Sequence, residues 1–262
     1  MTGFSIVTVD AENVEGTGFF CLKNKRHAGY LAKRSWLQRR FEEGMRIKLL
    51  LTEGGNQAGF LEYIPGEYTW RVIRAPNYLV IHCLWVKSGQ LASSGLASAL
   101  LQHCLDDAVT TGLEGVAVVT SDGPWMASKG VFLKNSFVLV DEAPPSFQLL
   151  VRRTGGGPFP SFPNDWDERL SRCRDLQLLY TNQCPYIGKA IADLPSVAER
   201  HGIQLHLVEM VDSVEARERM PSPYGVFSLV YEGRLLADHP ISATRFKNIL
   251  QKDLKLRPRD AS

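Results

Sequence analysis

A segment rich in glycine and proline divides this sequence into two unequal parts. Residues 154–168 read Thr-Gly-Gly-Gly-Pro-Phe-Pro-Ser-Phe-Pro-Asn-Asp-Trp-Asp-Glu, with three glycines and three prolines. Because proline lacks a backbone donor and glycine is costly to order, we expect neither a regular helix nor a central strand here. The sequence therefore predicts a linker over residues 154–175, between a first domain of residues 1–153 and a second of residues 176–262.

The composition is compatible with two folded domains. Of the 262 residues, 44% are hydrophobic and 22% are charged, so each side of the linker can bury a core of its own. The net charge of +2 argues against a dedicated nucleic-acid binder. No apolar run approaches the roughly 18 residues of a membrane span, and the N-terminus does not read as a signal peptide. We therefore expect a cytoplasmic protein without a nucleic-acid or membrane partner.

The cysteines follow no recognisable pattern. The five are Cys21, Cys83, Cys104, Cys173 and Cys184. They form no C-x-x-C pair, and no histidine stands at a spacing typical of zinc sites. We expect neither a disulfide framework nor a metal site.

Hydrophobic periodicity predicts mixed α/β structure in the first part. Strands are expected at Phe4–Val9, Met45–Thr52, Gln57–Ile64, Asn77–Val86, Gly115–Thr120, Phe137–Val140 and Phe147–Val151. Helices are expected within Lys25–Glu43, at Leu96–Thr111 and at Met126–Asn135.

The most informative stretch runs from an apolar strand through glycine and serine residues directly into a helix, over Leu84–Leu101. Free N–H groups in the first turn of a helix form an anion site, and Gly95 and Ala97 would let a phosphate approach the backbone closely. Pyrophosphate is the natural ligand for such a site. An ordinary strand-loop-helix corner with Ser94 as the N-cap is the alternative.

The order of elements and this loop together resemble the GNAT acyltransferase superfamily. Its signature, [Gln/Arg]-x-x-Gly-x-[Gly/Ala], falls on Ala92-Ser-Ser-Gly95-Leu-Ala97, and the resemblance covers residues 1–153. Further stretches are similar to the acetyltransferase half of YoaP-like proteins, which also carry a small C-terminal domain. These are Gly18-Phe-Phe-Cys21, Trp36-Leu37, Phe60–Pro65, Ala75–Leu79, Trp85-Val86 and Gly89-Gln90.

The resemblance implies a donor of the acyl-CoA type, with its pantetheine arm beside the strand that ends at Val86. The backbone of that strand, including Leu84, Trp85 and Val86, would pair with pantetheine. Amides of the loop and the first helical turn would hold the pyrophosphate, at Leu91, Ala92, Ser93, Ser94, Gly95, Leu96 and Ala97.

Two positions depart from the family pattern. Ala92 replaces the usual Gln or Arg, so one side-chain donor to pyrophosphate is missing. Phe132 occupies the usual tyrosine position, so the phenol that often protonates the departing thiolate is absent. A loop that relies on backbone amides would serve a single phosphate nearly as well. A carrier protein with a phosphopantetheine thioester is therefore an alternative donor to acyl-CoA.

Two titratable side chains are candidates for proton transfer. Strict alternation along Asn77–Val86 places His82 on one face with Tyr78, Val80 and Leu84, and Leu79, Ile81, Cys83 and Trp85 on the other. A histidine suits general-base chemistry at neutral pH, unless it is a core histidine bonded to the backbone. Glu62, one strand away, is the other candidate base, unless it faces solvent. An acceptor pocket could be lined by Tyr63, Tyr68, Trp70, Trp125 and Cys184.

The second part predicts a β-α-β-α-β-β-α order, with Cys184-Pro-Tyr at the start of its first helix. This order resembles a thioredoxin-like fold and the C-terminal domain of YoaP-like proteins. A helix N-terminus should lower the pKa of the Cys184 thiol. Ile187 stands where a dithiol oxidoreductase has its second cysteine, which favours docking or dimerisation over redox chemistry.

The sequence therefore predicts an N-acyltransferase that moves an acyl group from a pantetheine thioester to an amine of a small molecule. Transfer from an acyl carrier protein in specialised metabolism is one alternative. A non-catalytic binding protein with degenerate sites and a thiol-dependent oxidoreductase are two others. Either a monomer or a homodimer is compatible with the sequence.

Overall fold

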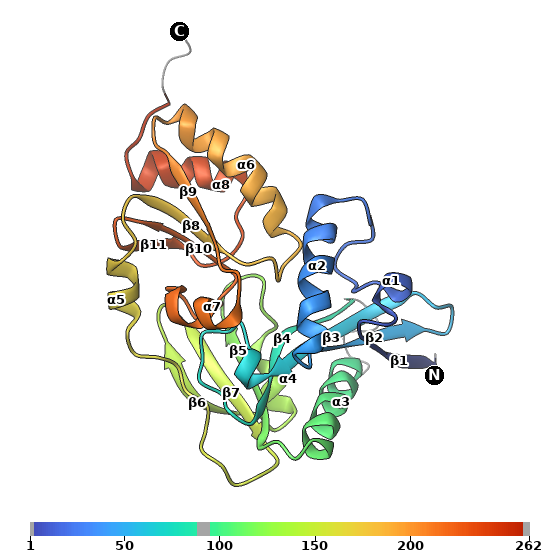
Figure 1. Cartoon of the computed structure of the whole chain (residues 1–262). Coiled ribbons are helices and arrows are strands. Elements are labelled where there is room, and N and C mark those ends of the chain that lie inside the picture. The colour runs from blue at the N-terminus through green and yellow to red at the C-terminus, as the bar shows by residue number, and fades with distance from the viewer. Residues whose placement is uncertain (1–2, 88–94, 259–262) are drawn as a thin grey trace.

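Two β-sheets with helices packed on them make up the structure (Figure 1). It is a computed structural model that describes residues 3–87 and 95–258. The larger sheet has seven strands in the order β1-β2-β3-β4-β5-β7-β6, and all of its strands precede Thr154. The smaller sheet has the order β11-β10-β8-β9, and all of its strands follow Asp175. The predicted mixed α/β architecture is confirmed for the larger sheet.

The elements of the larger sheet lie close to their predicted positions. Its strands are β1 (Phe4–Val9), β2 (Arg46–Thr52), β3 (Gln57–Pro65), β4 (Tyr78–Val86), β5 (Gly115–Ser121), β6 (Val138–Ala143) and β7 (Phe147–Arg153). The helices around it are α1 (Val14–Thr17), α2 (Ala28–Glu42), the 3-10 turn η1 (Gly66–Tyr68), α3 (Leu96–Thr110) and α4 (Lys129–Lys134). All strand pairs are antiparallel except β4 with β5.

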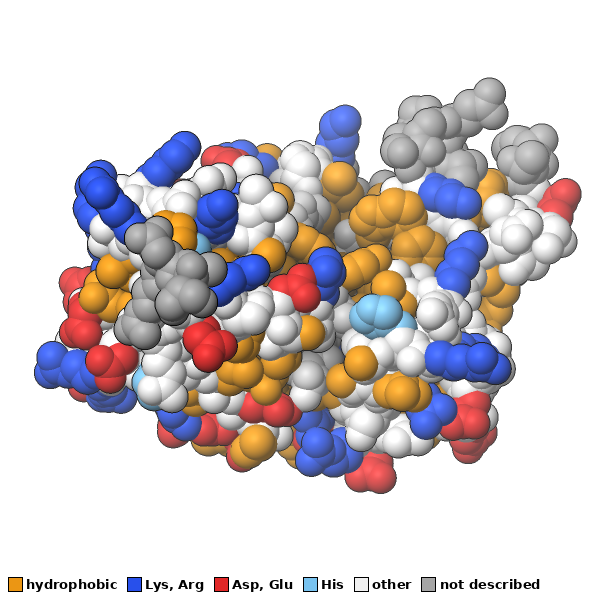
Figure 2. Space-filling model, turned by 90° about the horizontal axis from the view of Figure 1, so that it is seen from above, with side chains coloured by type: hydrophobic (Ala, Val, Ile, Leu, Met, Phe, Trp, Pro, Cys, Tyr) orange, Lys and Arg blue, Asp and Glu red, His pale blue; other side chains and the backbone are white. Residues whose placement is uncertain are grey.

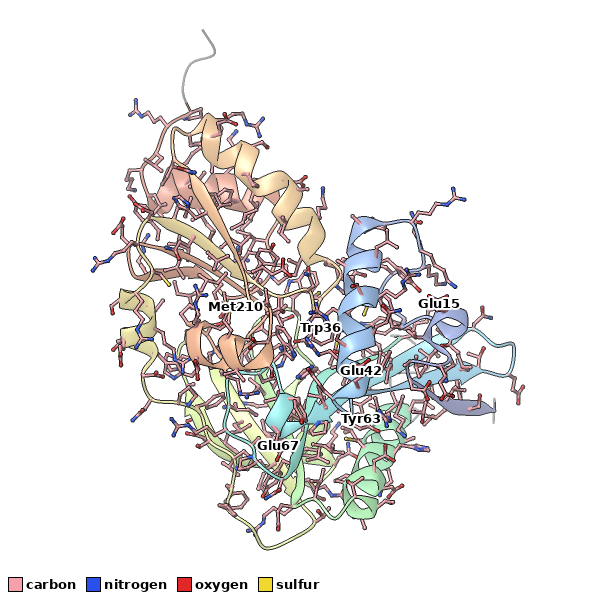
Figure 3. All side chains as sticks on the ribbon, in the orientation of Figure 1. Glu15, Trp36, Glu42, Tyr63, Glu67 and Met210 are labelled. Atoms are coloured by element: carbon pink, nitrogen blue, oxygen red, sulfur yellow. The ribbon has the colours of Figure 1, made fainter. Side chains whose placement is uncertain are left out.

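Helices α2 and α3 cover opposite faces of the larger sheet (Figure 1). Alternation in β3 decides which side chains meet each helix. Phe60 and Ile64 share an apolar cluster with α2, whereas Leu61 and Tyr63 share another with α3. Figure 3 shows this division, with Trp36 on α2 and Tyr63 toward α3.

The second part has the predicted order of elements. These are β8 (Leu176–Tyr180), α6 (Ile187–Arg200), β9 (Leu205–Glu209), α7 (Ser213–Arg219), β10 (Phe227–Tyr231), β11 (Arg234–Ala237), α8 (Ala243–Asn248) and a π-helical turn, η2 (Ile249–Asp253). Strand β8 pairs with β9 in parallel and with β10 antiparallel. Helix α6 forms the connection between the two parallel strands.

One prediction for the connecting segment is wrong. A short helix, α5 (Trp166–Ser171), lies within the predicted linker of residues 154–175. The helix begins after the last proline of the segment, Pro163, so nothing in its own six residues prevents helical hydrogen bonding. An ion pair of 2.7 Å between Asp165 and Arg169 spans its first turn.

The two sheets share a continuous apolar core instead of burying separate ones. A single cluster of buried side chains extends from α2 and the near face of the larger sheet into the smaller sheet, and it includes Trp36, Trp70, Tyr224 and Leu178. Backbone groups also meet across this junction, where the N–H of Val72 donates to the carbonyl of Pro223 at 3.3 Å. The face of the molecule that Figure 2 shows carries hydrophobic side chains together with charges of both signs.

No helix in the described residues is long and apolar enough to cross a membrane. Within the same residues, no group of three or more histidine, cysteine or acidic side chains is placed to hold a metal ion.

Gly225 is tightly packed at the junction, because a Cβ atom there would lie 2.0 Å from the carbonyl oxygen of Trp70. Its φ of +66° also favours glycine. We expect Gly225→Ala to cost more than about 3 kcal/mol of unfolding free energy, measured by urea denaturation.

Gly55→Ala is the matched control, since Gly55 also has a positive φ (+72°) but has open space at its Cβ. Only the backbone strain of about 1 kcal/mol should appear there. Equal losses in the two variants would show that close packing at the junction does not matter for stability.

Candidate functional site

Strand β4 has one residue more than β3 in the stretch where they pair. Glu62 pairs with Cys83, but the next residue of β3, Tyr63, pairs with Ile81. His82 is therefore the extra residue of a β-bulge, which locally reverses the alternation of side chains.

The bulge overturns the strict alternation predicted for β4. Leu84 is buried in the α3-side cluster together with Leu79 and Ile81. Cys83 packs instead against the α2-side cluster, on the face that was predicted for Leu84. The strand residues after His82 therefore point to the faces opposite to those expected. The extra residue shifts the two-residue alternation of side chains along β4 by one position.

Beyond the bulge, β4 separates from β5. The two strands pair in parallel only from Tyr78 with Gly115 to Ile81 with Val118. Strand β5 continues to Ser121 and remains paired with β7. The edge of β4 that faces β5 is therefore not paired with β5 over residues 82–86 in the described structure. Apart from the His82 carbonyl, which accepts from Arg71, its backbone groups are available to an extended ligand.

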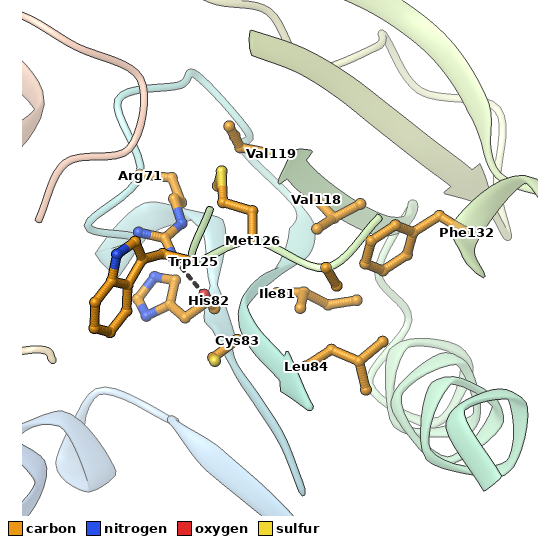
Figure 4. Close-up of a pocket in the computed structure, with 11 residues that line it drawn as sticks. Arg71, Ile81, His82, Cys83, Leu84, Val118, Val119, Trp125, Met126 and Phe132 are labelled. Carbon is orange, nitrogen blue, oxygen red and sulfur yellow. Dashed lines mark hydrogen bonds between the residues drawn. The ribbon is translucent and has the colours of Figure 1, made fainter. Parts of the chain in front are cut away.

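A small pocket lies where the strands separate (Figure 4). Side chains from β4, β5 and the segment that leads into α4 form its walls. They are Arg71, Ile81, His82, Cys83, Leu84, Val118, Val119, Trp125, Met126, Ala127 and Phe132. Most of these side chains are apolar, and they include one cation and one imidazole.

Glu62 is a buried carboxylate with a buried partner. It is 3% exposed, and its Oε2 accepts from the Lys33 Nζ of α2 at 2.6 Å. Burial alone would raise the pKa of Glu62, but the charge of Lys33 and the neighbouring His82 ring outweigh it and lower the pKa to about 2. Glu62 is therefore ionised at neutral pH, and the alternative that it faces solvent is wrong.

His82 is held by the backbone and stays neutral. Its Nε2 accepts from the Trp70 N–H at 3.2 Å, so the ring proton is on Nδ1, which faces the Glu62 Oε1 at 3.6 Å. Burial lowers the pKa of His82 to about 4. With Nε2 already occupied, His82 has no free lone pair, and this favours the alternative of a bonded core histidine over a general base.

Arg71 connects the pocket to the smaller sheet. Its guanidinium, 2% exposed, donates to the carbonyl of His82 in the bulge and to the carbonyl of Tyr224 next to β10. The cation also lies over the Tyr224 ring, 4.8 Å from its centroid. Burial lowers the pKa of Arg71 from its ordinary value.

Cys184 lies near this site, but its thiol is not activated. Tyr186, not Cys184, is the residue that caps α6, and burial raises the pKa of the Cys184 thiol more than a backbone bond at Tyr186 lowers it. The prediction of a lowered pKa is therefore wrong, since desolvation exceeds the effect of the helix end. The Tyr186 hydroxyl donates to the carbonyl of Cys21 at 2.8 Å, and its ring lies 5.6 Å from that of Trp125.

The aromatic residues predicted for an acceptor pocket do not gather in one place. Trp125 lines the pocket, and Trp70 lies in the shared core with only its backbone at His82. Tyr68 is 46% exposed in η1. Tyr63 points to the opposite face, where its hydroxyl donates to Asp107, because adjacent strand residues alternate. Tyr63 therefore cannot share a pocket with Glu62.

The predicted donor-binding residues are only partly described. Leu91, Ala92, Ser93 and Ser94 lie outside the described residues. Gly95 precedes α3 with a φ of +75°, a conformation that favours glycine. Leu96 is buried, Ala97 is half-buried, and Leu84 faces the pocket. Trp85 is 44% exposed against Phe20, whereas Val86 packs on the α3 side.

Three buried residues of this region are absent from the sequence predictions. They are Lys33, Arg71 and Tyr224. A lysine within the apolar stripe of α2, next to Tyr30 and Leu37, is a signal that could have indicated Lys33. No comparable signal in the sequence marks Arg71 or Tyr224, which come together at the site only in the folded chain.

Comparison with known proteins places this chain beside one curated relative. It is 30% identical over 250 residues to the uncharacterized N-acetyltransferase YoaP of Bacillus subtilis (strain 168), covering 93% of this chain and 97% of that protein. No family model matches the chain.

Solved structures resemble the chain at lower identity. A GNAT acetyltransferase from Staphylococcus aureus Mu50 is 11% identical over 58% of this chain and 99% of its own, with a TM-score of 0.41. The ribosomal-protein-S18-alanine N-acetyltransferase of Escherichia coli is 12% identical over 60% of this chain and 97% of its own, also with a TM-score of 0.41.

Replacing Lys33 should leave the buried charge of Glu62 without a partner. We expect Lys33→Met to lower the unfolding free energy by about 3–5 kcal/mol, because an unpaired buried carboxylate remains. Urea denaturation measures the loss. Lys189→Met is the control, since Lys189 forms an exposed ion pair with Asp193 and should cost at most about 1 kcal/mol. A loss no larger than that of the control would contradict a tight Lys33–Glu62 pair.

The burial of His82 should make stability depend on pH. Its folded pKa of about 4 lies below the ordinary 6.5, so the unfolded chain binds the extra proton between these values. Stability should therefore be full above pH 6.5 and fall by about 3 kcal/mol as the pH drops to 4. His82→Gln should remove this slope in denaturation curves recorded at several pH values. The matched control His103→Gln, at an exposed site, should retain the pH-dependent slope. An unchanged slope in His82→Gln would show that another titrating group causes the pH dependence of stability.

Proposed function

This chain belongs to the GNAT N-acetyltransferase family that includes YoaP, and on that premise we propose that it transfers an acyl group from acyl-CoA to an amine of a small molecule. The separation of β4 from β5 beyond Ile81 carries the proposal. It leaves a backbone edge and an apolar pocket side by side, which suits the amides and the acyl end of a pantetheine thioester.

The residues around the pocket fit such a donor. The unpaired edge of residues 82–86 offers backbone donors and acceptors to the pantetheine arm. Gly95, with its left-handed backbone, is the N-cap residue of α3 and has no atom of the described residues within 4 Å of its Cβ position, so a phosphate can approach the helix end. The donor supplies an activated acyl carbonyl, and the chain aligns it for attack.

Glu62 is the group we assign to the acceptor amine. Its Oε1 has no hydrogen-bond partner among the described residues, and the carboxylate is ionised. It can accept a hydrogen bond from the amine, directly or through a water, and pass on the proton that the amine must lose, which it holds only transiently because its pKa is about 2. His82, neutral and bonded to the backbone, instead orients its Nδ1–H toward the same carboxylate.

We also propose that residues 176–262 form a thioredoxin-like domain that packs on the first part and completes the acceptor side of the site. The parallel β8–α6–β9 unit and the antiparallel β10–β11 hairpin support this assignment. Ile187, buried at the first turn of α6, leaves Cys184 without a second thiol at that position. The domain therefore has a structural role in acyl transfer instead of dithiol chemistry.

The donor and the reaction are tested with purified protein, a panel of acyl-CoAs and small amines, and an assay for released thiol. Turnover with free acyl-CoA is the expected result. Turnover only with acyl groups on a carrier protein would replace the donor, and binding without thiol release from either donor would overturn the proposal.

The role of Glu62 is tested with the acceptor that the panel identifies. We expect Glu62→Gln to reduce kcat/KM by about 10²–10⁴-fold, because an amide cannot take up the amine proton. Glu12→Gln, at an exposed site before α1, is the matched control and should retain full activity. Activity of Glu62→Gln within threefold of the unchanged protein would exclude the carboxylate from proton transfer.

A further inference from the structure

Arg71 is a buried cation without a counter-ion. No carboxylate of the described chain forms a salt bridge with it, and its two hydrogen bonds go to the neutral carbonyls of His82 and Tyr224. Its Nε–H has no acceptor among the described residues. A buried charge that is left unpaired is costly, so an anion that enters the pocket would relieve this cost.

The other charges near Arg71 cancel. Glu62 is neutralised by Lys33 at 2.6 Å, and burial keeps His82 neutral. The guanidinium is therefore the excess charge at the pocket, and Figure 4 shows it beside His82 and Trp125 on the wall opposite Phe132. In a pocket lined mainly by apolar side chains, a single positive charge acts strongly on any negative charge that develops there.

Acyl transfer creates such a charge on sulfur. A departing thiolate usually needs either a proton or a cation, and Phe132 has no hydroxyl to donate. Resting on the acyl-transfer function proposed above, we infer that Arg71 is a catalytic residue that stabilises the thiolate leaving group.

The step conserves atoms and charge. The neutral amine nitrogen forms a bond to the thioester carbon, and the carbonyl electrons move to oxygen. When the carbonyl forms again, the carbon–sulfur bond breaks and its electron pair leaves with sulfur as a thiolate paired with Arg71. The proton lost by the nitrogen passes by way of Glu62 or water, and the thiolate takes up a proton after release.

The smaller sheet fixes the position of Arg71. The Arg217 side chain of α7 donates to the carbonyl of Thr69 at 2.8 Å, and Gly225 packs against the carbonyl of Trp70. Arg71 itself is bonded to Tyr224. The segment from Thr69 to Val72 is thus held by several contacts with the second part, which keep the guanidinium at the pocket.

The basicity of the leaving group provides the test. Arg71→Met and Arg71→Lys are compared with the unchanged protein on two donors with the same acyl group, acetyl-CoA and the aryl thioester S-phenyl thioacetate. An aryl thiolate is a much weaker base and needs less stabilisation. We expect Arg71→Met to lose about 10²–10³-fold in kcat/KM with acetyl-CoA but less than about tenfold with the aryl thioester. Arg71→Lys should recover part of the loss.

Arg217→Met is the matched control. It removes a hydrogen bond to the same segment but leaves the pocket cation in place, so any loss of activity should be equal for the two donors. An equal loss for both donors in Arg71→Met would overturn the inference, because it would assign Arg71 to structure or to the carbonyl oxygen. A rise confined to the KM of the amine would instead assign it to acceptor binding and would also overturn it. Failure of the unchanged protein to release thiol from either donor would count against the proposed function itself.

Discussion

The β-bulge at His82 is the constraint on which the candidate site depends. One inserted residue turns Cys83 toward α2 and Leu84 toward α3, and at the same place β4 loses its parallel pairing with β5. A sheet that continued to pair would satisfy every backbone group and leave no room for a ligand. The bulge therefore connects a local irregularity of the backbone to the presence of a pocket and an unpaired strand edge.

Polar groups on the α2 side are then arranged around that irregularity. The His82 ring is held by the backbone of Trp70, and its other nitrogen faces Glu62, whose charge is balanced by Lys33. Low solvent access makes each of these interactions strong, and it also makes an unbalanced charge costly. Arg71 is the one such charge at the pocket walls, and it is held there by contacts with the smaller sheet.

The part of the chain that contains the smaller sheet therefore contributes to the candidate site. It shares one apolar core with the larger sheet, and Tyr224, Gly225 and Arg217 contact the loop that carries Arg71. Glycine at position 225 is required by both its backbone conformation and its distance from Trp70. These contacts explain how a segment more than 140 residues away in sequence can determine the geometry of the pocket.

The sequence by itself determined the strands, the main helices and the position of Glu62 and His82 on neighbouring strands, because hydrophobic period and turn residues are local signals. It could not place the residues of β4 beyond His82, since a bulge is decided by pairing with β3 and has no signal in the period of β4. The alternation of β3, in contrast, already separates Tyr63 from Glu62. The Cys184 pKa, the salt bridge of Lys33 and the site of Arg71 were likewise decided only by tertiary structure. Each of these three features depends on burial or on a partner from a distant segment. Neighbouring residues in the sequence encode neither the burial nor the partner.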